Sequence, residues 1–381
     1  MSETQKILDL WRSSAERDDE CLLATVVGVD GSSYRKPGAR MLLTRGGLRA
    51  GTISGGCLEG EVAKKAWWLT ESGATVQHYT SFYDEDSGDA YGLGCGGTVH
   101  VLLERAPAAD AILSALQRNR QQRDALAVVS IVDSADHAEI VGTHLVAAAN
   151  GDTVYRSMNI DVADALRKIA NEVLAARRSS WHTATLAGTG CHVFAEFIAP
   201  PTELLIVGAG DDAKPLAAYG HSLDWKVTVA DGRSHLARRE RFPDADAVQV
   251  LAGEAPMESL PVTPETVVVL MTHSYQQDRD MLRALLPSEV AYIGVLGPKR
   301  RTAQLVHQIA AEIAMSEEQC MSRIHSPVGL DLGADSPAGV ALSIAAEIHA
   351  FLRARNPIPL RRKAVIAGTG QRGACIEMPG A

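Results

Sequence analysis

The segment ELLIVGAG, residues 203–210, most restricts how this chain can fold. A short aliphatic run leads directly into Gly208 and Gly210, and a helical pattern follows. A buried strand that turns through glycines into a helix is typical of the first βαβ unit of a Rossmann fold. The same short, β-branched pattern recurs further along the chain, in KVTVADGR, TVVVLMTHS and AYIGVLG. Because helical segments separate these runs, the sequence predicts a doubly wound parallel sheet in the C-terminal half.

The N-terminal half has the pattern of strands with interspersed helices. CLLATVVGVDGSSY predicts a strand that ends in a turn, and RMLLTRGGLRAGTIS predicts a hairpin around Gly46 and Gly47. Apolar residues at helical spacing mark three further segments, residues 58–69, 107–122 and 162–178. No repeat is long enough to suggest a solenoid.

Consecutive prolines in APPT, residues 199–202, predict a domain boundary, because they end helices and are excluded from central strands. The predicted fold class is α/β, with a mixed-sheet N-terminal domain followed by a C-terminal Rossmann-like doubly wound parallel sheet. We expect the N-terminal domain at 1–198, the Rossmann-like domain at 203–354 and a tail at 355–381.

Composition excludes several classes of partner. The 381 residues carry a net charge of −9 and only 5% aromatic residues, which argues against nucleic acid and acidic membranes. No apolar run is long enough to span a bilayer, and the first residues lack a secretory signal. The six cysteines form no CxxC pair, so we expect no metal site and a reducing, cytoplasmic location.

The segment 31–58 combines basic residues with glycines in an otherwise acidic chain. It contains Arg35 and Arg40 but no acid, which suits a small anionic ligand, although a charge run alone is more often a solvated face. Gly55 and Gly56 precede a predicted helix, so their N–H groups are candidates to bind an anion. Cys57 is expected in the first turn of that helix, where the helix dipole lowers a thiol pKa.

A second glycine-rich turn, GLGCGG at 92–97, contains Cys95 and Gly96. Glycines allow a ligand to approach the backbone closely, so two such turns in one domain indicate a site. Taken separately, each cysteine is more often a small buried residue. The sequence thus nominates Cys57 and Cys95 as a pair of functional thiols, with Cys57 the more reactive.

The strand ends of the C-terminal half supply a second group of candidates. Asp231 ends the second strand, where an acid holds a ribose hydroxyl in dinucleotide-binding proteins. His273 follows another strand, and Asp278 is expected to orient it. Gly297 and Arg300 lie at a further strand-to-helix turn that suits an anion, unless a neighbouring acid explains the basic residues there.

Two acids weaken the case for a bound dinucleotide. Asp211 and Asp212 stand at the predicted helix start, where a diphosphate needs bare N–H groups and no negative charge. NAD(P) is therefore a weaker candidate than the glycines alone suggest.

Seven blocks of sequence together resemble the xanthine dehydrogenase accessory family, XdhC/CoxI, from about residue 21 to 353. They are GSSYRKPGARM, GTISGGCLEGEV, GLGCGGTVHVLLE, LLIVGAG, VVVLMTHSYQQD, AYIGVLGPKRR and SPVGLDLGADSPAGVALSIAAEI. One position departs from the resemblance, since the family usually has histidine after GAG, where this chain has Asp211.

The resemblance implies a molybdenum cofactor maturation factor. Such a protein binds molybdopterin cofactor, supports its sulfuration and delivers it to a molybdenum hydroxylase such as xanthine dehydrogenase. We accordingly expect a cofactor-binding chaperone rather than a turnover enzyme, acting as a homodimer and with a cysteine desulfurase as a further partner.

Two other functions stay open. An NAD(P)-dependent oxidoreductase would use the Rossmann domain directly, with His273 as the proton donor. A pure scaffold would contact the target enzyme without holding cofactor.

Overall fold

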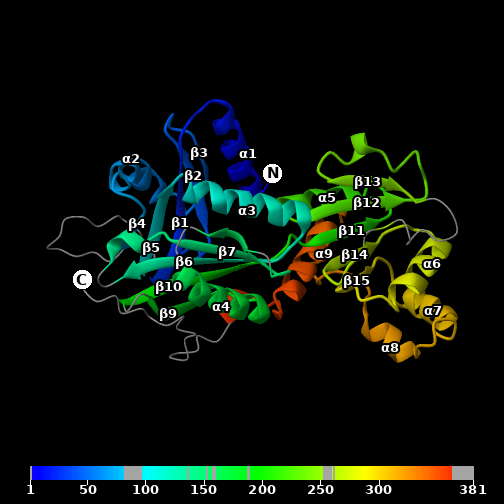
Figure 1. Ribbon diagram of the computed structural model, residues 1–381. Coiled ribbons are helices and arrows are strands. Elements are labelled where there is room, and N and C mark those ends of the chain that lie inside the picture. The colour runs from blue at the N-terminus through cyan, green and yellow to red at the C-terminus, as the bar shows by residue number, and fades with distance from the viewer. Residues whose placement is uncertain are drawn as a thin grey trace. The chain divides into compact units, whose positions relative to one another are not determined.

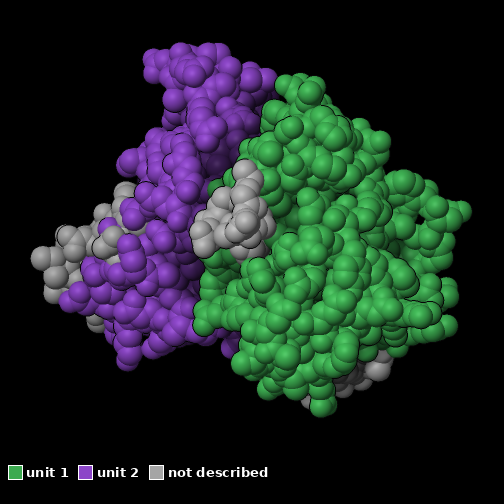
Figure 2. Space-filling view, turned by 90° about the vertical axis from the view of Figure 1, so that its right-hand side faces the viewer, with its two compact units in different colours: residues 1–2, 201–365 green, residues 3–200, 366–381 purple. Residues whose placement is uncertain are grey.

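The computed structural model describes residues 2–80, 97–134, 137–151, 153–156, 160–186, 189–251, 260 and 262–362. The chain divides into two compact units. The N-terminal unit comprises Glu3–Pro200, and the C-terminal unit begins at Pro201 (unit 2 and unit 1 of Figure 2, respectively).

The C-terminal unit contains a parallel sheet of six strands in the order β13-β12-β11-β14-β15-β16 (Figure 1). The strands are β11 (Glu203–Val207), β12 (Lys226–Asp231), β13 (Ala247–Val250), β14 (Thr266–Leu270), β15 (Tyr292–Val295) and β16 (Ile324–His325). All neighbouring strands pair in parallel, and β11 and β14 are buried along their whole length. The predicted doubly wound sheet is therefore confirmed, with its change of strand order between β11 and β14.

Helices cover both faces of this sheet. They are α5 (Ala213–Ser222) and α9 (Pro337–Leu352) on one face, and α6 (Tyr275–Leu285), α7 (Lys299–Ile309) and α8 (Glu317–Ser322) on the other. The sheet is buried on both faces because each has its own apolar layer, which explains the continuous β-branched strands of the sequence.

The N-terminal unit contains two antiparallel sheets of five strands each (Figure 1). The first sheet, in the order β3-β2-β1-β5-β4, comprises β1 (Cys21–Gly31), β2 (Arg40–Thr44), β3 (Arg49–Gly51), β4 (Thr75–Thr80) and β5 (Gly97–Arg105). The second, in the order β8-β7-β6-β10-β9, comprises β6 (Leu126–Ser134), β7 (His144–Ala148), β8 (Thr153–Arg156), β9 (Ser180–Leu186) and β10 (Thr189–Ile198). The predicted hairpin is present as β2 and β3.

The two sheets have the same topology. Each half of the unit runs helix, three strands, helix, two strands; the helices are α1 (Glu3–Glu16) and α2 (Glu59–Leu69), then α3 (Ala108–Gln122) and α4 (Ile160–Ala176). The strand registers also correspond, since β1 pairs with β2 over five residue pairs and β6 pairs with β7 over five. A bulge omits Val27 from the pairing of β1 with β5, and the equivalent bulge omits Val132 from the pairing of β6 with β10. The unit is thus a tandem repeat of one supersecondary arrangement.

Buried polar pairs, each with one glutamate, join the two repeats reciprocally. Arg40 of β2 binds Glu196 of β10, and its Nη1 lies 3.0 Å from Glu196 Oε1. His144 of β7, which occupies the position equivalent to Arg40, binds Glu104 of β5, the equivalent of Glu196. Contacts that repeat with the roles of the halves exchanged are typical of an isologous interface between two copies.

Apolar residues complete the contact between the repeats. Val27 and Leu102 of the first sheet pack against Val132 and Phe194 of the second. The outer faces of the sheets are covered by α2 and α4, respectively. Because each sheet is covered on both sides, the connections between strands and helices are where this unit exposes its candidate functional groups.

Candidate functional site

The connection between β3 and α2, residues 52–58, contains the exposed thiol of Cys57. Glu59, the first residue of α2, turns its buried carboxylate back into this connection. Its Oε1 accepts hydrogen bonds from the backbone N–H groups of Ile53 (3.1 Å) and Ser54 (2.9 Å), and the Ser54 hydroxyl donates to its Oε2 (2.6 Å). An internal carboxylate therefore fixes the shape of this turn.

Ser54 organises the remainder of the turn. Its Oγ accepts hydrogen bonds from the N–H groups of Gly56 and Leu58, each at 3.1 Å. Gly56 has a φ of +116°, which a residue with a side chain rarely adopts. The prediction that the Gly56 N–H is free for an anion is therefore wrong. Cys57 was also expected inside the helix, but α2 begins at Glu59 and the thiol lies just before it.

The stability of this turn depends on the ionisation of the Glu59 carboxylate. Burial raises its pKa, but the hydrogen bonds from Ser54 and Ile53 outweigh burial and hold the pKa below the ordinary glutamate value. A carboxyl with a depressed folded-state pKa stabilises the fold above its unfolded pKa, and that contribution disappears as the pH falls through the folded value. The turn should therefore loosen only in acid.

Replacing Glu59 by glutamine should loosen the turn at neutral pH. A hydrogen bond to a charged group is worth about 1.5–3 kcal/mol, so local opening should become easier by an amount of this order. We expect faster alkylation of Cys57 by iodoacetamide in Glu59→Gln than in the unmodified protein. Glu61→Gln is the control, because Glu61 of the same helix pairs with Lys65 on the surface. Equal rates in the two variants would contradict this role for Glu59.

Three arginines of segment 31–58 have acidic partners elsewhere in the chain. Arg35 binds Glu3, Arg40 binds Glu196 and Arg45 lies near Glu20. Arg40 is only 7% exposed, so its guanidinium has a structural role between the repeats rather than a place on the surface. The segment contains no acid of its own, but α1 and more distant parts of the chain supply the countercharges.

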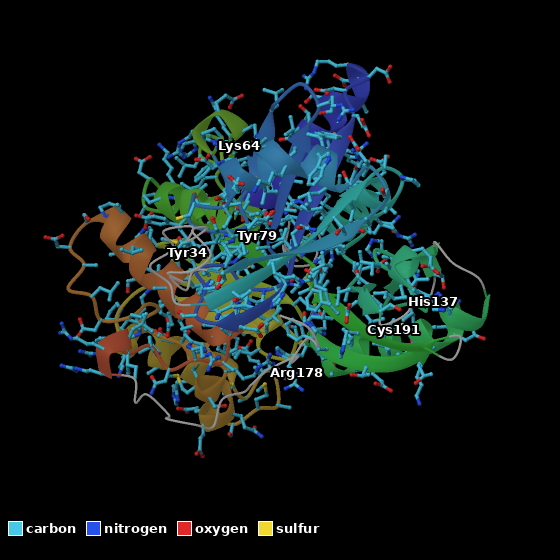
Figure 3. The ribbon with its side chains drawn as sticks, turned by 90° about the vertical axis from the view of Figure 1, so that its left-hand side faces the viewer. Tyr34, Lys64, Tyr79, His137, Arg178 and Cys191 are labelled. Atoms are coloured by element: carbon cyan, nitrogen blue, oxygen red, sulfur yellow. The ribbon has the colours of Figure 1, made fainter. Side chains whose placement is uncertain are left out.

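Tyr34 is a residue that the sequence analysis did not nominate. Tyr34 is labelled in Figure 3. The residue is 75% exposed, and two of its ring carbons lie 3.8 Å from where a Cβ of Gly55 would be. An exposed aromatic ring beside a glycine turn offers a flat apolar surface to a ligand. The signal was present in GSSYRKPG, where a large aromatic residue stands in a turn sequence.

Two connections are longer in the first repeat than the equivalent connections in the second. Residues 52–58 connect β3 to α2, whereas only residues 157–159 connect β8 to α4. Residues 81–96 connect β4 to β5, whereas only 187–188 connect β9 to β10. Cys95 and Gly96 belong to 81–96 and lie outside the described residues. Both predicted cysteine turns therefore fall in stretches that are longer in the first repeat than in the second.

The described cysteines differ in access to solvent. Cys57 is exposed, whereas Cys21, Cys191 and Cys320 are buried. Burial also raises the pKa of the Cys21 and Cys320 thiols. We expect Cys57 to be alkylated first among these four in the native protein, as followed by peptide mapping with mass spectrometry. Native-state labelling of Cys21, Cys191 or Cys320 at the rate of Cys57 would contradict the structure.

The glycine turn of the C-terminal unit is closely packed. Gly208 has a φ of +122°, and a Cβ there would meet Met271 O at 2.3 Å, so β14 ends too near to admit a side chain. Gly210 follows in the same turn, where a Cβ would meet the Asp212 carboxylate.

Asp231 has partners within the unit. Its carboxylate accepts hydrogen bonds from Ala209 N (2.7 Å) and from the guanidinium of Arg233 at both oxygens. Burial raises the pKa of Asp231, but the bonds from Arg233 and Ala209 outweigh it and lower the pKa. A ribose would have to replace Arg233 to reach this carboxylate.

His273 lies at the carboxyl end of β14, with a φ of +56° that a non-glycine residue seldom adopts. Its Nε2 is 2.9 Å from Asp212 Oδ2, and its side chain is 65% exposed. The expectation that Asp278 orients this histidine is wrong. Asp278 is buried and instead accepts from the Thr272 hydroxyl at 2.6 Å and from Arg301 at 2.5 Å.

Asp278 accounts for one of the basic residues in the turn after β15. Gly297 adopts a φ of +123°, and Arg301 pairs with Asp278 while Arg300 stays exposed. The structure thus brings His273 and Asp212 together at the β11–β14 switch point, and it places Arg300 at the start of α7.

Two kinds of feature are absent from the part of the chain that the structure describes. No group of three or more histidine, cysteine, aspartate and glutamate side chains there could hold a metal ion. Among the helices of the same residues, none is long and apolar enough to cross a membrane.

A cysteine-bearing α/β unit followed by a Rossmann-type unit is the class of protein that this fold and turn define. Residues 14–80 match the XdhC and CoxI family, and residues 204–348 match the XdhC Rossmann domain. The chain is 30% identical over 339 residues to a probable xanthine dehydrogenase subunit of Bacillus subtilis (strain 168), covering 87% of this chain and 93% of the relative. The chain therefore belongs to the XdhC and CoxI family.

Two further relatives agree with this assignment. The molybdenum cofactor insertion chaperone PaoD of Escherichia coli (strain K12) is 23% identical over 336 residues, covering 86% of this chain and 82% of PaoD. A crystal structure described as a xanthine dehydrogenase from Bacillus halodurans superposes with a TM-score of 0.71 at 27% identity. That alignment covers 93% of this chain and 97% of the other.

Proposed function

We propose that this protein is a maturation factor for molybdenum hydroxylases, which holds molybdopterin cofactor as cargo and passes it to an enzyme of the xanthine dehydrogenase type. The observation that carries the proposal is the exposed thiol of Cys57 in a turn fixed by Glu59. The family and a relative named as a molybdenum cofactor insertion chaperone support it.

The chemistry of the turn suits the chemistry of this cargo. A thiol is a soft ligand, and it suits contact with molybdenum or with the sulfur that sulfuration adds. Tyr34 offers a flat surface beside Gly55, against which a pterin ring can stack. We further propose that the protein supports sulfuration of the cofactor and that a cysteine desulfurase supplies the sulfur.

The proposal is tested by co-expression with a molybdenum hydroxylase in a host that makes molybdopterin. Omitting this protein should leave the amount of hydroxylase polypeptide unchanged and lower the fraction that is active. An equal active fraction with and without the protein would remove the maturation role.

The rival function is an NAD(P)-dependent oxidoreductase, and the Rossmann unit argues against it. Asp211 and Asp212 place carboxylates at the start of α5, where a diphosphate would bind. The Asp231 carboxylate, which would hold a ribose hydroxyl, is already paired with the guanidinium of Arg233. Titration with NAD or NADP should therefore give weak or absent binding by calorimetry. The companion variant Asp211→His restores the residue usual in the family. Tight, saturable binding with hydride transfer to a small substrate would favour the oxidoreductase.

A further inference from the structure

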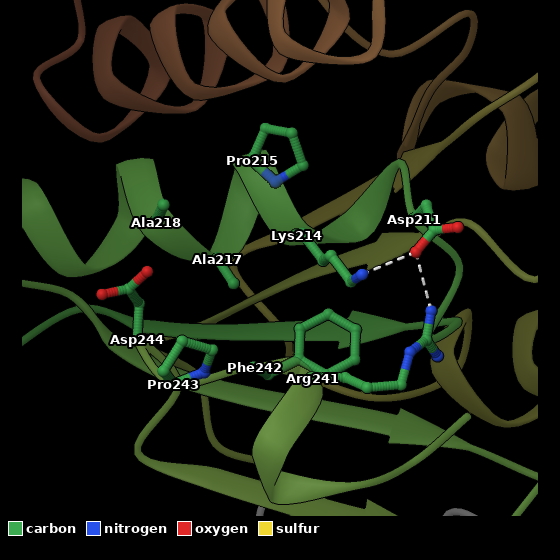
Figure 4. Close-up of a pocket in the computed structure, with 9 residues that line it drawn as sticks. All are labelled: Asp211, Lys214, Pro215, Ala217, Ala218, Arg241, Phe242, Pro243 and Asp244. Atoms are coloured by element: carbon green, nitrogen blue, oxygen red, sulfur yellow. Dashed lines mark hydrogen bonds and ion pairs between the residues drawn. The ribbon is translucent and has the colours of Figure 1, made fainter. Parts of the chain in front are cut away.

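A pocket of about 470 Å³ opens on the C-terminal unit, between α5 and the turn formed by residues 241–244 (Figure 4). Cavities of this size commonly hold small organic ligands. The residues that line it are Asp211, Lys214, Pro215, Ala217, Ala218, Arg241, Phe242, Pro243 and Asp244. The proposed maturation role does not use this pocket.

Two cations converge at one end of the pocket. Lys214 Nζ and Arg241 Nη2 lie 2.7 Å and 2.9 Å from the same oxygen, Asp211 Oδ1. Arg241 is held in place from behind, because its Nη1 donates to the carbonyl oxygens of Ala209 (2.7 Å) and Leu236 (3.0 Å). The guanidinium is therefore positioned by the backbone and does not depend on Asp211.

Asp211 is a weakly held partner for these cations. Its side chain is 80% exposed, and hydrogen bonds from Lys214 and Arg241 lower its pKa, so it is fully ionised at neutral pH. Exposed ion pairs of this kind contribute little to stability, so the carboxylate can turn into solvent at small cost. Together, Asp211, Lys214 and Arg241 carry a net charge of +1. Lys214 and Arg241 can therefore bind the anionic group of a ligand in place of the Asp211 carboxylate.

The rest of the pocket is apolar and ends in another acid. Pro215, Ala218 and Pro243 contribute accessible apolar surface, and Ala217 and Phe242, which are almost fully buried, also line the pocket. Such apolar surface suits the face of a ring. Asp244 is exposed at the end opposite Asp211 (Figure 4). A carboxylate there suits a ligand that donates a hydrogen bond from its far end.

We propose that this pocket binds a small aromatic anion, with a phosphate or carboxylate on Lys214 and Arg241 and an amino group toward Asp244. Until the ligand arrives, Asp211 pairs with both cations and neutralises part of their charge. The phosphate-bearing and carboxylate-bearing versions of such a ligand share this chemistry and are separated by the test.

The test is titration of the full chain with adenosine 5′-monophosphate and with 4-aminobenzoate, followed by saturation-transfer NMR. Adenosine is the neutral control. At least one anion should bind at millimolar concentration or below, and adenosine should bind about tenfold more weakly than its monophosphate because it lacks the charged group. Failure of both anions to bind at millimolar concentration would overturn the proposal.

Variants locate the binding. Lys214→Gln should weaken the anion about tenfold, whereas Lys168→Gln, which removes an exposed lysine from α4 of the N-terminal unit, should not change it. Asp211→Asn should tighten binding several-fold, since it removes the competing carboxylate. If Lys214→Gln and Lys168→Gln bind the anion with equal affinity, the binding site lies elsewhere and the proposal is wrong. An unchanged affinity in Asp211→Asn would contradict it in the same way.

Discussion

Glu196→Ala is expected to lower the free energy of unfolding of the N-terminal unit by about 3–5 kcal/mol, because it leaves the Arg40 guanidinium buried without its carboxylate. An arginine cannot shed its proton to escape that cost. The measurement is urea unfolding followed by circular dichroism, with hydrogen exchange in β1 and β6 to assign the change to this unit.

The reciprocal pair supplies a matched control. Glu104→Ala removes the equivalent carboxylate in the first repeat, but its partner His144 can be neutral when alone. We therefore expect Glu104→Ala to cost less than Glu196→Ala. The double variant Arg40→Leu, Glu196→Leu should recover most of the loss, because it removes both charges from the interior. A Glu196→Ala protein as stable as the unmodified one would show that the pair does not join the repeats.

Cys57→Ala is expected to lower the active fraction of a co-expressed molybdenum hydroxylase about tenfold or more, to the level seen without this protein. The thiol is exposed at the tip of the turn, so its removal should change the chemistry and leave the fold intact.

Cys320→Ala is the matched control for that variant, because it removes a buried thiol from the Rossmann unit. It should leave hydroxylase activation near normal. If Cys57→Ala also matures the hydroxylase normally, the cysteine is present only because it is small.

The sequence predicted the Rossmann unit well, because its strands and helices are local patterns. The run 203–207 and the glycines after it required a buried parallel strand, and the structure has β11 there, with α5 starting at Ala213. Helices of the N-terminal unit are local patterns too. Those predicted near 107–122 and 162–178 are present as α3 and α4, with ends shifted by at most two residues.

Partners from distant parts of the chain could not be predicted in this way. Arg35 and Arg40 seemed free because no acid stands near them in the sequence, but Glu3 and Glu196 lie 32 and 156 residues away along the chain. The same limitation misassigned Asp278 to His273, since Asp212 reaches the histidine from another strand end. A count of charged residues within a short segment therefore does not predict which of them form ion pairs in the folded chain.

The tandem repeat was also invisible in the sequence. Gly38-Ala39-Arg40 and Gly142-Thr143-His144 occupy equivalent places, yet they share only the glycine. What the repeats share is strand register and the almost continuous burial of β1 and β2 and of their equivalents β6 and β7, and many apolar residue types satisfy both. A search for identical residues at a fixed spacing has little to detect in such a pair.

The central claim is that the Cys57 turn holds molybdopterin, and pterin analysis of the purified protein tests it most directly. The protein would be isolated from a molybdopterin-producing host and oxidised, and its fluorescent pterin products would be counted per chain. We expect pterin to co-purify with the unmodified protein and with Cys320→Ala, and to be strongly reduced in Cys57→Ala. No pterin on the unmodified protein, or equal pterin on all three, would contradict the account.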